Sequence, residues 1–283
     1  MTTIDASLPS SMDAAAPGTV RPVTLARVIR SEWIKLRTLR STWWGLGAVI
    51  VLMVGVGALA AAVSTGSVAT PGGVSTGPGG DDPLSTVLTG ANLCVLLLGV
   101  LGALAGAREY GSRMISATVA AVPRRWPVVL AKSVVLAALV LAATLVGIIG
   151  AYAAGMAILS AGGGATVSLG DDGVLRTLFG MAGYLTAVAL LGLGLGVLFR
   201  SVAASVGTII GALLIVPALA GALLPDSWDT VLQVLPSNAA AAFTAVQSTG
   251  SQVLSPTGGA LTLVAWVLAV LGGAVVSVVK RDV

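Results

Sequence analysis

The chain has 283 residues, of which 56% are hydrophobic and 9% charged, so it carries more apolar surface than one soluble core of this length can bury. Its net charge of +4 does not indicate nucleic-acid binding, because the basic residues lie between apolar stretches and form no single patch. One cysteine and no histidine exclude a disulfide framework and a cysteine–histidine metal site.

The N-terminal region predicts a tail followed by an amphipathic helix. Residues 1–20 are rich in Ser, Ala and Pro, a composition typical of a disordered cytoplasmic tail. In residues 21–42 apolar side chains recur every three or four positions and cations occupy the rest of the turn. Such a helix lies in the headgroup layer near anionic lipid, either as a topology anchor or as a mechanical element that joins span one to a cytosolic partner. Its candidate residues are Arg27, Arg30, Trp33, Lys35, Arg37 and Arg40.

Six stretches without Asp, Glu, Lys or Arg follow, each about as long as an α-helix that crosses a bilayer. Within a transmembrane domain of residues 43–283 they cover 43–63, 84–107, 133–158, 177–198, 202–224 and 260–279. The connections hold Gly, Pro, Ser and Asp, and Asp82 with Pro83 predicts a helix cap and a first helical position. The fold class expected is therefore an all-α membrane protein with six transmembrane helices.

The basic residues predict the orientation of these spans. Every Lys and Arg except Arg176 falls in 21–40, in 108–132, at Arg200 or after span six, and these positions share one side of the membrane. The opposite connections carry six aspartates instead. The positive-inside rule places both termini in the cytoplasm, and the even number of spans agrees. We expect a multi-pass protein of the cell membrane.

The connection 108–132 is too apolar for a segment that is solvated only by cytoplasm. It predicts a short helix over about 110–121, stopped by Pro123, with the Glu109 carboxylate near its start. This helix either lies on the protein's own membrane surface or docks a separate subunit. The predicted contact residues are Glu109, Tyr110, Met114, Ile115, Val119 and Val122.

Two further patterns concern helix geometry. Pro217 predicts a kink in span five, and the long outer connection 225–259 predicts one or two short helices that act as a lid or as a hydrophobic anchor. Small residues four apart predict that helix backbones approach closely. These pairs are Gly102 with Gly106, Gly192 with Gly196, and Gly207 with Gly211.

Missing motifs narrow the function. No lysine follows a glycine, so the chain has no P-loop, and any ATP must be hydrolysed by a partner. The spans hold no ionisable residue that could relay protons. They also lack a histidine, paired carboxylates and an activated nucleophile, the groups that an intramembrane enzyme would need. We therefore expect neither an ion-coupled pump nor an enzyme.

The order of these features resembles the permease subunit of type 2 ATP-binding-cassette (ABC) exporters, especially the short actinobacterial forms. The resemblance rests on SEWIKLRTLRSTWW at 31–44, on REYGSRMISAT, AVPRRWP and LAK through 108–132, and on the six spans with a long outer connection. The first stretch is similar to that family's connecting helix and the second to its cytoplasmic coupling helix. Where many members have Gly-Thr after the acidic residue, this chain has Arg113 and Met114.

The resemblance implies partners and a function. Two ABC ATPase subunits would bind ATP and Mg²⁺, leaving no cofactor in this chain, and a second permease subunit would complete a homodimer or heterodimer. Membrane lipid would surround the assembly, and no nucleic acid is expected. The uncharged spans favour an apolar or amphipathic cargo for export. The alternative is a membrane anchor or regulator of a cytosolic partner that transports nothing.

Overall fold

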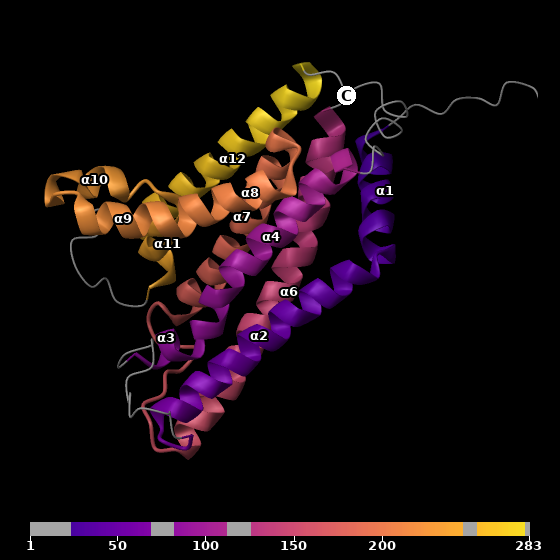
Figure 1. Cartoon of the computed structure of the whole chain (residues 1–283). Coiled ribbons are helices and arrows are strands. Elements are labelled where there is room, and N and C mark those ends of the chain that lie inside the picture. Colours follow the sequence, from indigo (N-terminus) through magenta and orange to yellow (C-terminus); the bar gives the residue numbers. More distant parts are fainter. Residues whose placement is uncertain (1–23, 69–81, 112–125, 246–253, 281–283) are drawn as a thin grey trace, which may run out of the picture.

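The computed structural model describes residues 24–68, 82–111, 126–245 and 254–280, which form helices and no strand. Six helices or helix runs are long and apolar enough to cross a membrane (Figure 1). They are α2 (Arg40–Ser64), α4 (Thr89–Gly111), α6 (Trp126–Ala161), α7 (Val174–Phe199), the run from α8 (Val202–Ile210) through η1 (Gly211–Ile215) to α9 (Val216–Leu223), and α12 (Pro256–Lys280). The all-α fold class with six spanning helices is confirmed.

Some helices begin earlier or later than the sequence pattern indicated. α6 begins at Trp126, seven residues before the expected span, and so includes Lys132. Its 36 residues extend roughly 54 Å, well beyond a hydrocarbon core of about 30 Å. Span two is preceded by the short helix α3 (Pro83–Val87), whose N-cap Asp82 accepts hydrogen bonds from the backbone N–H groups of Leu84 (3.1 Å) and Ser85 (3.3 Å). The predicted cap is confirmed.

The centre of the bundle is the pair formed by α4 and α7, which pack together more extensively than any other described pair of helices. A Cβ added at Gly102 would collide with the backbone carbonyl of Ala189, and one added at Gly196 would collide with that of Ala103. Glycine is required here because the two backbones touch, as the small-residue pairs on these helices predicted. Gly207 differs, because a Cβ there meets no atom of the chain within 4 Å.

The remaining spans surround this pair. α2 packs on α6, and α12 packs on α7 together with α11 (Pro236–Thr244), whose Ala239, Ala240 and Phe243 are buried. The outer connection also contains η2 (Asp226–Trp228) and α10 (Asp229–Leu232). The predicted short helices are thus present, and the burial of α11 favours hydrophobic anchoring over a free lid.

Span five is the least enclosed of the six spans. In its most apolar stretch 17% of the residues are buried, compared with 67% in that of α7. Its regular helix is interrupted by the π-helical turn η1, immediately before Pro217. Proline lacks the N–H that would bond to the carbonyl four residues earlier, so the wider turn accommodates it. The π-helical turn lies just before Pro217, and the kink expected at this proline stays a prediction.

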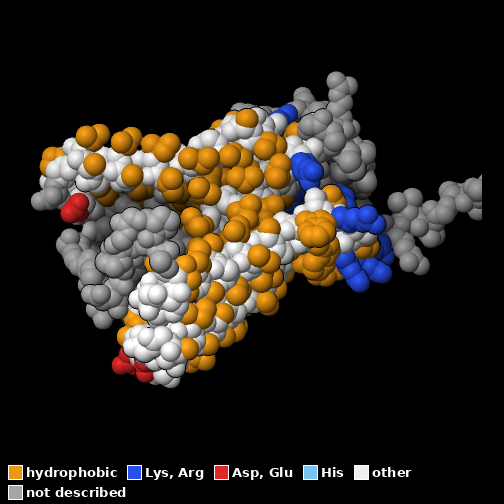
Figure 2. Space-filling model, turned by 60° about the horizontal axis from the view of Figure 1, so that its bottom comes forward, with side chains coloured by type: hydrophobic (Ala, Val, Ile, Leu, Met, Phe, Trp, Pro, Cys, Tyr) orange, Lys and Arg blue, Asp and Glu red, His pale blue; other side chains and the backbone are white. Residues whose placement is uncertain are grey.

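Charge separates the two ends of the bundle (Figure 2). We call the basic end the one where α4 and α7 finish and where α2 and α6 begin, which carries Arg40, Arg108, Lys132 and Arg200. Among the described Lys and Arg residues, Arg176 alone lies at the opposite end, near the aspartates of the 162–173 connection. α1 (Leu25–Thr38) lies against α6 at the basic end (Figure 1).

Candidate functional site at the basic end of the bundle

The helix α1 is fixed to the start of α6 by a small apolar contact and a buried ion cluster. Val28 packs with Val128 and Ala131 of α6, and all three are buried. One turn further along α1, the Glu32 side chain is only 2% exposed. Its carboxylate lies 3.3 Å from Lys132 Nζ through Oε2 and accepts a 2.6 Å hydrogen bond from Lys35 Nζ through Oε1. A buried carboxylate at this place requires its cations, because a lone buried charge is costly.

Sequence reasoning did not single out Glu32 as a functional residue. A signal was present, since Glu32 lies four residues from both Val28 and Leu36 and so falls on the apolar side of the amphipathic helix. A carboxylate on the apolar side of a helix becomes buried when the helix packs, so a cation from another helix is expected to contact it. Which cation that is could not be read from the sequence, because Lys132 is 100 positions away.

The junction between α1 and α2 is a defined bend. The expected helix over 21–42 is two helices, because Leu39 adopts an extended backbone conformation (φ −77°, ψ 109°) between them. Across this bend the indole Nε1 of Trp43 donates a 3.0 Å hydrogen bond to the carbonyl of Arg37. The angle between α1 and the first span is therefore held by a specific contact.

Most of the predicted residues of the amphipathic helix are exposed. Arg27, Arg30, Arg37 and Arg40 are exposed, Trp33 is 39% exposed, and Lys35 is half-buried beside Glu32. Leu25 and Ile34 of the same helix are also exposed. Their contact with a lipid headgroup layer remains a prediction.

Tyr110 anchors the other flank of the 112–125 segment. α4 continues through Gly111, so Glu109 and Tyr110 belong to its last turn, and the rest of the helix predicted over about 110–121 lies outside the described residues. Tyr110 packs against a buried apolar cluster that contains Val129 of α6, Val197 of α7 and Val278 of α12. The Arg200 guanidinium carbon lies 5.1 Å from the centre of this ring, within the range of a cation–π contact. Arg200 itself ends α7 in the left-handed conformation (φ 54°).

The structure describes only part of the predicted docking residues. Tyr110 is placed as above, and Glu109 is placed only as part of the α4 backbone. Met114, Ile115, Val119 and Val122 lie outside the described residues. The structure describes the helices on both sides of 112–125. Before it, α4 is held to α7 and α12 through Tyr110, and after it, α6 is held to α1 through Lys132.

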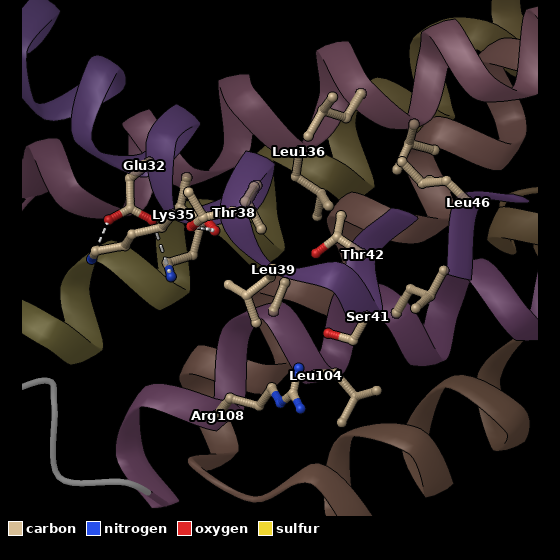
Figure 3. A pocket seen from close by; sticks show the side chains of 16 residues that line it. Glu32, Lys35, Thr38, Leu39, Ser41, Thr42, Leu46, Leu104, Arg108 and Leu136 are labelled. Atoms are coloured by element: carbon tan, nitrogen blue, oxygen red, sulfur yellow. Dashed lines mark hydrogen bonds and ion pairs between the residues drawn. The ribbon is translucent and has the colours of Figure 1, made fainter. Parts of the chain in front are cut away.

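A cavity of about 580 Å³ lies at this end between α1, α2, α4 and α6 (Figure 3). Glu32, Lys35, Lys132 and Arg108 contribute to its wall, and so do the hydroxyl-bearing side chains of Thr38, Ser41 and Thr42. Leucines form most of the rest of the wall. In the described ranges no three His, Cys, Asp or Glu side chains are grouped to hold a metal ion. The arrangement is suited to binding and mechanical coupling.

Together, the six spanning helices and the opposed charge at the two ends define a multi-pass α-helical membrane protein. A comparison with family models agrees, because the model described as "ABC-2 family transporter protein" matches residues 28–218. The chain belongs to this family, and it is accordingly a transporter permease without ATPase activity of its own. No curated protein matched the sequence.

Proposed function

We propose that this chain is the permease subunit of an ABC exporter of the short actinobacterial type. It moves an apolar or amphipathic substrate out across the cell membrane with ATP hydrolysed by a separate ATPase. Both termini lie in the cytoplasm, so the basic end faces the ATPase, which is present in two copies. The observation that carries the proposal is the family match, which spans α1 and both flanks of 112–125.

The coupling surface in this proposal is Glu109, Tyr110, Met114, Ile115, Val119 and Val122. Support comes from Tyr110, which packs where α4, α6, α7 and α12 meet. Pressure from the ATPase on 112–125 would reach α7 and α12 through Tyr110 and would reach α1 through Lys132 and Glu32. α1 serves as the second mechanical element, because its bend at Leu39 is bridged to the first span by Trp43.

A second permease subunit completes the transporter, as a homodimer or a heterodimer. We place it against span five, which is the least enclosed span and exposes Leu214, Ile215 and Leu219. Gly207 and Gly211 leave room there for the backbone of another helix to approach. The substrate path then lies between the two subunits, and its wall is apolar, which supports an apolar or amphipathic cargo.

The test is purification of the tagged chain from its native membrane, followed by assay for a stoichiometric ATPase. We expect Ile115→Asp to lose the ATPase, because a charge would enter an apolar contact. The matched control is Leu169→Asp, which puts the same charge on an exposed position of the 162–173 connection, at the other end of the bundle. That variant keeps the ATPase.

Transport is measured in inverted membrane vesicles as ATP-dependent accumulation of an amphipathic fluorescent dye. Wild type and Leu169→Asp accumulate dye and Ile115→Asp does not. An ATPase that stays bound to Ile115→Asp contradicts the proposed coupling surface. Absence of any ATPase from the wild-type preparation favours a membrane anchor or regulator that transports nothing.

A further inference from the structure

The cavity at the basic end has polar and apolar parts that are separated along the helix axes. Its polar wall includes Lys35 of α1, Ser41 and Thr42 at the start of α2, and Arg108 near the end of α4. Its apolar wall includes Leu46 of α2, which lies about 6 Å further along its helix than Thr42 at 1.5 Å per residue. On the other two spans the apolar residue also lies further from the basic end than the charged one. Leu101 lies roughly 10 Å from Arg108 along α4, and Val140 lies roughly 12 Å from Lys132 along α6.

The polar part lies at the level where tryptophan side chains emerge from the bundle. Trp43 and Trp44 directly follow the two hydroxyl residues and are 54% and 80% exposed. Trp126 begins α6 at the same end and is 40% exposed. Exposed tryptophans mark the boundary between headgroups and acyl chains. The polar wall therefore lies at headgroup depth, and the leucines lie in the hydrocarbon layer.

The charge of the wall favours an anion. Among the described residues that line the cavity, Lys35, Arg108 and Lys132 are cationic, and Glu32 is the one carboxylate. Glu32 contacts Lys35 and Lys132, and Arg108 reaches the cavity from the opposite wall, on α4 (Figure 3). Guanidinium, ammonium and hydroxyl groups are the donors that bind phosphate oxygens.

We propose that this cavity is a binding site for one anionic glycerophospholipid of the surrounding membrane. The phosphate lies between Lys35, Arg108 and the hydroxyls of Ser41 and Thr42, and the first part of an acyl chain lies along Leu46, Leu101 and Val140. The volume of about 580 Å³ is that of a site for a ligand of drug-like size, which suits a headgroup and part of a chain. The lipid bridges α1 to three spans as a resident component, whatever the cargo of the transporter.

The proposal is tested on the full-length chain in mixed micelles, by the thermal unfolding midpoint as phosphatidylglycerol is added. Phosphatidylcholine, glycerol 3-phosphate and inorganic phosphate are added in separate series. A ligand that binds the folded state raises the midpoint. We expect phosphatidylglycerol to raise it, and phosphatidylcholine and both small phosphates to have little effect.

Three variants locate the binding. Arg108→Gln removes a cation from the wall, and we expect about tenfold more phosphatidylglycerol at half-saturation, since a charge-assisted contact is lost. Ala105→Phe fills the cavity without changing charge, and we expect it to abolish the rise. Thr42→Val keeps the shape and removes one hydroxyl, and it gives a smaller loss. The matched control, Lys280→Gln, removes a cation from the exposed end of α12, outside the cavity, and keeps the wild-type response.

Two results overturn the proposal. An equal response of all four variants to phosphatidylglycerol means that the lipid binds the general surface. A full response to inorganic phosphate or glycerol 3-phosphate means that the site takes a free anion and no lipid chain. The unfolding midpoint of each variant without lipid reports whether it folds, and Thr42→Val decides the question if the two larger changes prevent folding.

Discussion

Glu32 shows how one residue sets the position of a whole helix. Its carboxylate is enclosed between Lys35 on its own helix and Lys132 on α6. A buried ion pair contributes little net stability compared with apolar residues of the same volume, yet removal of one partner is strongly destabilising. The pair therefore determines where α1 docks more than how stable the fold is.

We expect Glu32→Gln to destabilise the protein by about 3 kcal/mol, because it removes the carboxylate from beside the buried Lys132 ammonium. Thermal unfolding in detergent and the rate of proteolysis near α1 measure the effect. Lys35→Gln is the control: its side chain is 36% exposed, so the change costs less than about 1 kcal/mol.

The double variant Glu32→Leu, Lys132→Met separates charge from packing. Both charges leave together, so we expect it to recover most of the stability that Glu32→Gln loses. A double variant no more stable than Glu32→Gln would show that the ion pair has a structural role that apolar packing cannot replace.

At the scale of helices, the contact between α4 and α7 depends on glycine. Small residues spaced four apart indicated that helix backbones approach closely. The sequence could not show which pairs meet inside the chain, because Gly102 with Gly106 and Gly207 with Gly211 have the same spacing. The structure separates them: the former pair faces the α7 backbone and the latter is open.

We expect Gly102→Ala to destabilise the bundle by roughly 1–3 kcal/mol, because even one methyl group collides with the Ala189 carbonyl and forces α4 away from α7. The unfolding midpoint in detergent measures this. Gly55→Ala in α2 is the matched control, since its new Cβ would meet no atom within 4 Å. Similar midpoints for the two variants would contradict the close backbone contact.

At the scale of the whole molecule, charge is distributed unequally between the two ends. Lys and Arg gather at one end in the described part of the chain, and the connections at the other end carry aspartates (Figure 2). The bilayer has a cytoplasmic side that retains cations, so this asymmetry predicts which end faces inward. The same inequality supports the placement of the ATPase at the basic end.

Cysteine labelling tests this orientation. Ser168→Cys, in the exposed 162–173 connection, should react with a membrane-impermeant maleimide in intact cells, whereas Ser31→Cys on α1 should react only after the cells are opened. Cys94 is buried and is replaced by Ala in both chains. Labelling of Ser31→Cys in intact cells would reverse the orientation and remove the proposed ATPase contact.

The sequence by itself determined the class of fold, the six spans and the Asp82 cap. Each of these depends on hydropathy, on length or on local backbone chemistry, and such properties act within a few turns of one helix. Only the tertiary structure decided that Glu32 meets Lys132, that Tyr110 packs where four helices end, and that a cavity with a polar and an apolar part lies beside α1. These contacts join residues that are distant in the chain, and the packing angles between helices, which no local pattern encodes, bring them together.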